Sequence, residues 1–245
     1  SLKDIAPVDL GAIVVKEALA RAQVEGNEVG HVVFGHVVNT EPRDMYLSRV
    51  AAINGGCAKE TPAMNVNRLC GSGLQAIVSA SQSILLGDCD IAIGGGAENM
   101  SRAPYASQAT RFGARMGDTK MVDMMVGALH DPFHTIHMGV TAENVAAEHG
   151  ITREAQDALA LESHRRAEVA WAEGRFKDQI VPVMLKSRKG DVAFDKDEHF
   201  RPGAKLEDFQ KMKPVFLKEN GTVTAGNASG INDAAAAVLL MEAGT

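Results

Sequence analysis

Cysteine is scarce in this sequence, with three residues among 245. An odd, thinly spread set of thiols does not suggest a disulfide framework and is typical of proteins in a reducing compartment. Long hydrophobic runs are also lacking, because none reaches the roughly 18 residues that a membrane-spanning helix needs. The first residues do not have the pattern of a signal peptide. We therefore expect a cytoplasmic protein with no membrane association.

Positive charge and aromatic side chains are also in short supply. Lys and Arg total 25 against 31 Asp and Glu, a net charge of -6, and aromatics make up 4% of the chain. Nucleic-acid binders normally carry a basic stripe, so this balance argues against a nucleic-acid partner. A local cationic patch can still hold a small anionic ligand. Hydrophobic residues at 45% and charged residues at 23% are typical of a globular chain.

Helix and strand signals alternate through the first hundred residues. Pro7 suits the first turn of a helix, and Gly55 with Gly56 suits the end of another. We expect helices over residues 6–22, 44–53 and 73–86, alternating with strands over residues 31–38, 63–67 and 90–93. This alternation predicts an α/β fold with a parallel sheet.

The pattern changes after Asn99, where the periodicity becomes weak. Residues 234–241 are again apolar enough to return to the sheet, so a long insertion over about residues 100–230 interrupts one α/β layer. Within it we expect helices over residues 141–148 and 152–173 and a charged, turn-rich stretch over residues 191–203.

The sharpest chemical signal is the segment Asn67-Arg68-Leu69-Cys70-Gly71-Ser72-Gly73-Leu74. It places Cys70 between an expected strand and an expected helix, where helix N–H groups favour a thiolate and can stabilise an oxyanion. The turn is similar to the nucleophile elbow of hydrolases, although Arg68 stands where that motif has Gly. A buried structural cysteine remains an alternative. Cys57 and Cys89 lack this setting, and we expect inert thiols there.

Four blocks of the sequence closely resemble the thiolase family, in particular its bacterial acetyl-CoA acetyltransferases and β-ketothiolases. They are residues 67–73, 94–101, 137–144 and 221–233. The resemblance implies a layered α/β fold that is one half of the usual two-half α-β-α-β-α sandwich, with an inserted α+β loop domain. Residues 1–99 with 231–245 would form the thiolase half. Residues 100–230 would form the loop domain, which covers CoA and carries tetramer contacts.

The resemblance also implies an acyltransferase activity. Cys70 would take an acyl group as a thioester, either to cleave a 3-ketoacyl-CoA with CoA or to condense two acyl-CoA molecules. Coenzyme A and acyl-CoA would be substrates, including acetyl-CoA and 3-ketoacyl-CoA, with no permanently bound cofactor and no metal. The expected assembly is a homotetramer, with the segment over residues 115–121 resembling the family's tetramerisation loop.

Six further site residues follow from the resemblance. Arg201 matches a position near the adenine and phosphates of CoA, and Ser229 matches a contact to the pantetheine arm. His137 and Met138 match the wall beside the acyl and pantetheine groups, with Phe216 and Ala225 lining the same channel. Alternatives stay open: Arg201 as a solvated cation, Ser229 as turn chemistry and Met138 as core filler.

Two other patterns carry less weight. The spacing of His130, His134 and His137 is not that of a zinc site, and Pro132 breaks any shared helix face. The glycines at 94–96 do not complete a dinucleotide-binding motif, because position 99 is Asn.

The sequence departs from the family in what it lacks. Thiolases use a His in a Gly-His-Pro motif and a second Cys before a glycine cluster, and neither motif is found here. His31 and His36 each follow a Gly, but Val comes next and both fall in an expected strand. We therefore expect the C-terminal half to be absent and this chain to be inactive or very weakly active alone. The alternatives are a ketoacyl-synthase-like condensing enzyme and a non-catalytic acyl-CoA-binding fragment.

Overall fold

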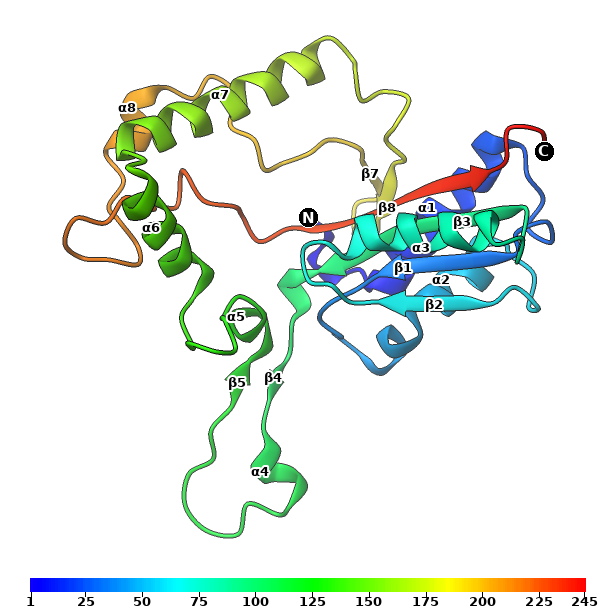
Figure 1. Ribbon diagram of the computed structural model, residues 1–245, viewed down its shortest axis with the longest axis horizontal. Coiled ribbons are helices and arrows are strands. Elements are labelled where there is room, and N and C mark those ends of the chain that lie inside the picture. The colour runs from blue at the N-terminus through cyan, green and yellow to red at the C-terminus, as the bar shows by residue number, and fades with distance from the viewer. The chain divides into compact units, whose positions relative to one another are not determined.

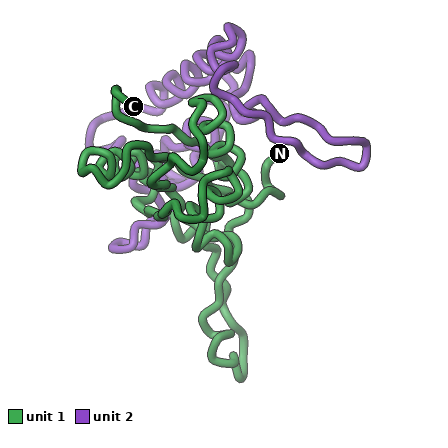
Figure 2. Tube along the Cα trace, turned by 90° about the vertical axis from the view of Figure 1, so that its right-hand side faces the viewer, with its two compact units in different colours: residues 1–128, 231–245 green, residues 129–230 purple.

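The computed structural model describes all 245 residues, which form two compact units. Unit 1 contains Ser1–Ala128 and Ile231–Thr245, and unit 2 contains Leu129–Gly230 (Figure 2). The expected division at residues 100 and 230 into a thiolase half and a loop domain stays a prediction. None of the helices has the length and apolar character needed to cross a membrane.

Unit 1 is built on a four-stranded sheet in the order β2-β1-β3-β8 (Figure 1). The strands are β1 (His31–Gly35), β2 (Ala63–Val66), β3 (Ile91–Asn99) and β8 (Asp233–Met241). The helices are α1 (Pro7–Ala22), α2 (Leu47–Gly55) and α3 (Ser72–Leu85), with short 3-10 turns at Leu2–Asp4, Pro42–Tyr46 and Met100–Arg102. The alternating α/β pattern is therefore confirmed.

The sheet is mixed rather than wholly parallel, which corrects one expectation. Strands β2, β1 and β3 are parallel, whereas β8 runs antiparallel to β3 along its full length. Parallel neighbours are joined by helical crossovers, as expected for the first hundred residues. Strand β8 instead follows unit 2 in the sequence. No βαβ crossover joins it to β3, so its direction is not constrained in that way.

Helices cover both faces of the sheet. Val32, Phe34 and Ile93 are fully buried under α1 and α2, while Val33 and Ala92 pack beneath α3. Successive side chains of a strand point to opposite faces, so this alternation follows directly from the strand geometry. The core thus holds α3, and the turn that precedes it, firmly on the sheet.

Strand β3 is longer than the expected strand over residues 90–93, because it runs on through three glycines. A Cβ at Gly94 would lie 2.8 Å from the Cα of Ile77 in α3. One at Gly95 would lie 2.4 Å from the carbonyl oxygen of Ala236 in β8. The glycines are therefore sites of close backbone approach, not a loop.

The chain also leaves β1 earlier than expected. The strand ends at Gly35, so His36 lies beyond it rather than inside it. The expected helix over residues 44–53 divides into the 3-10 turn Pro42–Tyr46 and α2. The Asp44 side chain accepts from the N–H of Glu41 at 3.1 Å and so caps that turn.

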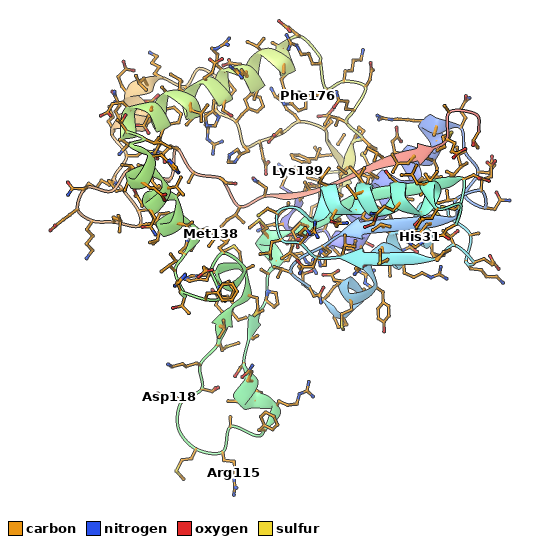
Figure 3. All side chains as sticks on the ribbon, in the orientation of Figure 1. His31, Arg115, Asp118, Met138, Phe176 and Lys189 are labelled. Atoms are coloured by element: carbon orange, nitrogen blue, oxygen red, sulfur yellow. The ribbon has the colours of Figure 1, made fainter.

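The remainder of unit 1 is a ribbon of β4 (Tyr105–Ala106) and β5 (Val122–Asp123), followed by α5 (Met124–Ala128). Helix α4 (Gln108–Arg111) lies in the connection between the two strands, which also carries Arg115 and Asp118 at its far end (Figure 3). The side chains of Phe112 and Met116 in this connection are almost fully exposed.

Unit 2 contains the helices α6 (Met138–His149), α7 (Arg153–Ala172) and α8 (Leu206–Gln210) and a hairpin of β6 (Val183–Leu185) and β7 (Val192–Phe194). Helix α6 begins three residues before the expected start, because His137 caps it with its own side chain. Strand β7 falls in the stretch where only turns were expected. Its pairing partner β6 lies outside that charged stretch, so local composition did not indicate a hairpin.

Candidate active site

Cys70 lies in a tight turn between the end of β2 and the start of α3. The Gly71 N–H donates to the carbonyl of Arg68 at 3.1 Å, and the Ser72 N–H donates to the carbonyl of Leu69 at 2.9 Å. Leu69 has φ of +48°, a left-handed conformation that costs energy for a branched side chain. This strained strand-to-helix turn resembles the elbow that the sequence suggested.

The buried hydroxyl of Ser72 closes the turn from inside. It accepts from the N–H of Arg68 at 2.9 Å and donates to the carbonyl of Leu69 at 2.6 Å. Behind it, a Cβ on Gly35 would lie 2.8 Å from the Cβ of Ser72 and 2.9 Å from the nitrogen of Gly73. The bare backbone of Gly35 therefore lets the first turn of α3 sit directly on β1.

The thiol of Cys70 differs from the other two in its surroundings. Cys70 is exposed next to Gly71, the residue that caps the N-terminus of α3. Cys57 is buried, and burial raises the pKa of its thiol to about 11. Burial also raises the pKa of Cys89, with Asp88 and Asp90 adding to the shift. Only a thiolate is a strong nucleophile, so Cys70 is the accessible candidate.

His36 belongs to a buried polar cluster that the sequence did not indicate. Its Nδ1 lies 2.8 Å from the carbonyl oxygen of Ala97 and 3.4 Å from Oε1 of Glu98. Its Nε2 lies 3.9 Å from Oδ2 of Asp44. The ring is thus enclosed between two carboxylates, and the Glu98 carboxylate in turn accepts from the N–H groups of residues 37 and 38.

In unit 2 the structure brings together three predicted site residues. His137 caps α6 by accepting the N–H of Gly139 on Nδ1 at 3.0 Å, and its ring stacks on that of Phe216 at 4.7 Å. Met138 is the first residue of α6 (Figure 3). Burial, followed by the neighbouring His130, lowers the pKa of His137. The neutral ring with its proton on Nε2 is therefore the form that fits the cap.

Ala225 and Ser229 lie on an exposed loop that is held by buried carboxylates. The Glu143 carboxylate in α6 accepts from the N–H and hydroxyl of Thr222 and from the N–H of Val223, at 2.7–2.9 Å. Further along, the side-chain amide of Asn227 donates to Asp157 of α7 at 2.9 Å. Ser229 itself donates weakly to the Gly230 carbonyl at 3.3 Å.

Sequence reasoning missed these supporting residues, although one signal existed. Glu143 and Asp157 are acidic residues on the buried sides of helices, at 4% and 0% exposure. A charged group is rarely buried unless it is paired. A polar residue on the inward side of an amphipathic helix can therefore point to a loop that it holds.

Arg201 lies in a separate part of unit 2, in the loop between β7 and α8. Its backbone N–H donates to Nδ1 of His164 at 3.1 Å, and its guanidinium donates to the carbonyl of Glu198 at 3.1 Å. The side chain is exposed. The structure contains no group of three or more His, Cys, Asp or Glu side chains placed to hold a metal ion.

Comparisons with known proteins find relatives that match nearly the whole chain. The family model described as Thiolase, N-terminal domain, matches residues 1–244. The chain is 72% identical over 242 residues to beta-ketothiolase BktB of Cupriavidus necator, covering 99% of this chain and 61% of that protein. It is 50% identical over 245 residues to an acetyl-CoA acetyltransferase of the same organism, covering 99% of this chain and 62% of that protein.

Solved structures give the same result. The crystal structure of the Bacillus anthracis acetyl-CoA acetyltransferase matches with a TM-score of 0.93 and 42% identity, over 99% of this chain and 61% of that one. Human mitochondrial 3-ketoacyl-CoA thiolase in complex with CoA matches with a TM-score of 0.94 and 40% identity, over 99% of this chain and 60% of that one. The chain thus spans about three fifths of the length of these relatives, and it belongs to the thiolase family.

Proposed function

We propose that this chain carries the acyl-accepting half of a β-ketothiolase or acetyl-CoA C-acetyltransferase, with Cys70 as the nucleophile. The observation that carries the proposal is the exposed Cys70 thiol in the strained turn before α3, next to the helix N-terminus. The Cys70 thiolate attacks the 3-keto carbon of a 3-ketoacyl-CoA, and the bond between C2 and C3 breaks. Acetyl-CoA leaves once its enolate carbon takes up a proton, which balances the proton lost by the Cys70 thiol. The thiol of a second CoA then takes the acyl group as acyl-CoA, and its proton restores the Cys70 thiol.

In this proposal the residues that contact CoA are residues of unit 2. Arg201 contacts the adenine and phosphates, and Ser229 and Ala225 contact the pantetheine arm from a loop that Glu143 and Asp157 hold in place. His137, Met138 and Phe216 form the wall beside the acyl group, and the stacking of His137 on Phe216 supports this role. The similarity to human mitochondrial 3-ketoacyl-CoA thiolase in complex with CoA supports CoA as the ligand.

The proposal also covers assembly and location. The exposed Phe112 and Met116 in the connection between β4 and β5 support a role for this segment in tetramer contacts. Leu74, Val78 and Leu85 form an exposed apolar stripe on α3, which supports packing of a further α/β half against that helix. The three free thiols support a cytoplasmic location for the protein.

The similarity to BktB supports a role as a β-ketothiolase in fatty-acid or polyhydroxyalkanoate metabolism.

A second candidate is a non-catalytic acyl-CoA-binding fragment. It is favoured by the absence from this sequence of a Gly-His-Pro motif and of a second cysteine before a glycine cluster. Without a base, the thiolate depends on the helix N-terminus, which contributes about 1 kcal/mol or less at an exposed site. Acid–base catalysis typically contributes about 10²–10⁴-fold in rate, so this chain alone would be slow.

The test is the intact mass of the chain after incubation with acetyl-CoA, followed by peptide mapping. A single acetyl group on Cys70, lost in Cys70→Ser and kept in the matched control Cys89→Ser, supports the nucleophile. Retained CoA binding with no adduct, while iodoacetamide still modifies Cys70, supports the binding fragment. An acetyl group on Cys57 or Cys89 alone would contradict the proposal.

A further inference from the structure

The loop that carries Arg201 is tied to α7 by two side-chain acceptors. Nδ1 of His164 accepts the backbone N–H of Arg201 at 3.1 Å, and Oε2 of Glu168 accepts the N–H of Gly203 at 3.0 Å. His164 and Glu168 are four residues apart in one helix, so they lie one above the other on the same face. One of the two acceptors is therefore an imidazole nitrogen, a group that ordinarily titrates near neutral pH.

We propose that His164 is a positioning residue for the nucleotide end of CoA, acting through the backbone of Arg201. The inference rests on the proposed function, in which the Arg201 guanidinium contacts the CoA phosphates. Neutral His164 accepts the Arg201 N–H and holds that residue against α7. A proton on Nδ1 turns this acceptor into a donor, so that two donors face each other and the contact is lost. CoA binding then weakens as the pH falls.

The surroundings of His164 favour its neutral form. The ring is half-buried, 6.2 Å from the ring of His199 and 5.8 Å from that of Phe209. Burial, followed by His199 and Arg201, lowers the pKa of His164 below its ordinary value of 6.5. The elements around His164 carry further charged or titratable groups. Within four residues of it on α7 these are Glu162, Arg165, Arg166 and Glu168. The loop carries Asp195, Lys196, Asp197, Glu198, His199, Arg201 and Lys205, and the first turn of α8 carries Glu207 and Asp208.

The sign of the effect follows from this direction. Because its pKa is lowered, His164 stays neutral from neutral pH down to that lowered value. Over this range the hydrogen bond from the Arg201 N–H is kept. The hydrogen bond to Arg201 is lost, and binding weakens, as the pH falls through that value, which lies below 6.5. CoA itself carries a 3′-phosphate monoester that titrates near pH 6. The ligand in the test is therefore 3′-dephospho-CoA, whose diphosphate keeps its charge in this range.

The first measurement is the dissociation constant of 3′-dephospho-CoA for the 245-residue chain between about pH 5 and about pH 8. We expect binding to weaken severalfold at the acid end. In His164→Asn the amide oxygen can accept the Arg201 N–H without titrating, so the pH dependence should vanish while neutral-pH affinity is kept. His164→Phe should bind weakly throughout. The matched control His149→Asn, at the exposed end of α6, should keep the full pH dependence.

A second measurement needs no ligand. The backbone amide resonance of Arg201 should follow the protonation of His164 in the free chain, and should not move in His164→Asn. A stationary Arg201 amide, or an unchanged pH dependence of binding in His164→Asn, overturns the inference and leaves the proposed function standing. No binding of 3′-dephospho-CoA at any pH overturns the proposed function and the CoA role of His164 together.

Discussion

The hydroxyl of Ser72 donates to the carbonyl oxygen of Leu69 at 2.6 Å, across the turn that presents Cys70. The Ser72 hydroxyl oxygen also accepts the N–H of Arg68 at 2.9 Å. One small buried side chain thus joins both flanks of the turn and supports the left-handed conformation of Leu69. The geometry of the proposed nucleophile depends on this residue, although Ser72 itself touches no reacting atom.

We predict that Ser72→Ala weakens this turn. It leaves the N–H of Arg68 without its acceptor, and a lost partner of this kind costs about 1–3 kcal/mol. Chemical unfolding should show that loss, and acetylation of Cys70 by acetyl-CoA should slow. The matched control is Ser81→Ala in the same helix, where the hydroxyl only supplements a helical carbonyl. Equal effects of the two changes would contradict the role given to Ser72.

Two glycines beside the turn should respond in opposite ways to alanine. A Cβ on Gly35 would press on the backbone of Ser72 at 2.7 Å. Overpacking of this kind costs about 1–3 kcal/mol, so Gly35→Ala should lower the free energy of unfolding. Gly73 lies in α3 with open space around its Cβ position. Gly73→Ala should therefore raise the free energy of unfolding, by up to about 1 kcal/mol.

Urea unfolding of the two glycine variants, side by side, checks the packing of α3 on β1. A neutral Gly35→Ala would show that the first turn of α3 can move away from the strand. In that case the position of Cys70 would not depend on Gly35.

Glu143 should contribute to stability only while it is ionised. Burial would raise its pKa, but hydrogen bonds from Thr222 and Val223 outweigh this and lower it below the ordinary value of 4.5. The contribution is therefore complete above about pH 4.5 and is lost as the pH falls through the lower folded-state value. Glu143→Gln replaces one acceptor by a donor and should cost about 2 kcal/mol at neutral pH.

The comparison for Glu143 is Glu148→Gln, an exposed residue of the same helix. Guanidinium unfolding at neutral pH and near pH 4 should show a difference between wild type and Glu143→Gln that shrinks in acid. Glu148→Gln should match wild type at both pH values. If Glu143→Gln lowers the free energy of unfolding equally at both pH values, the shape of the Glu143 side chain, and not its charge, holds the loop over residues 222–230.

Alkylation should distinguish the three thiols. With a pKa of about 11, Cys57 has few thiolates at pH 8, a fraction on the order of one in a thousand. Cys89 is half-buried and also has a raised pKa. Iodoacetamide should therefore modify Cys70 first, giving one adduct by intact mass, and should modify all three thiols in denaturant. Faster labelling of Cys89 than of Cys70 would contradict the assignment of the accessible thiol.

Local sequence determined much of unit 1. The alternation of helix and strand, the position of Pro7 and the turn around Cys70 all depend on residues within a few positions of one another, and each was predicted correctly. The resemblance to the family was also visible in the sequence, because the matching blocks are contiguous segments of the chain. Bounds were less accurate where a side chain from the neighbouring segment decided them, as with the cap that His137 gives to α6.

The tertiary structure alone decided which distant groups meet. Glu143 holds Thr222 across 79 residues of chain, and His36 contacts Glu98 only because β1 and β3 are neighbours in the sheet. The antiparallel course of β8 and the strand conformation of Gly94 and Gly95 likewise follow from packing against other elements. Periodicity and turn chemistry act over a few residues, so the sequence determined the turn that presents the Cys70 thiol. The supports of the loop over residues 222–230 depend on contacts that exist only in the folded chain.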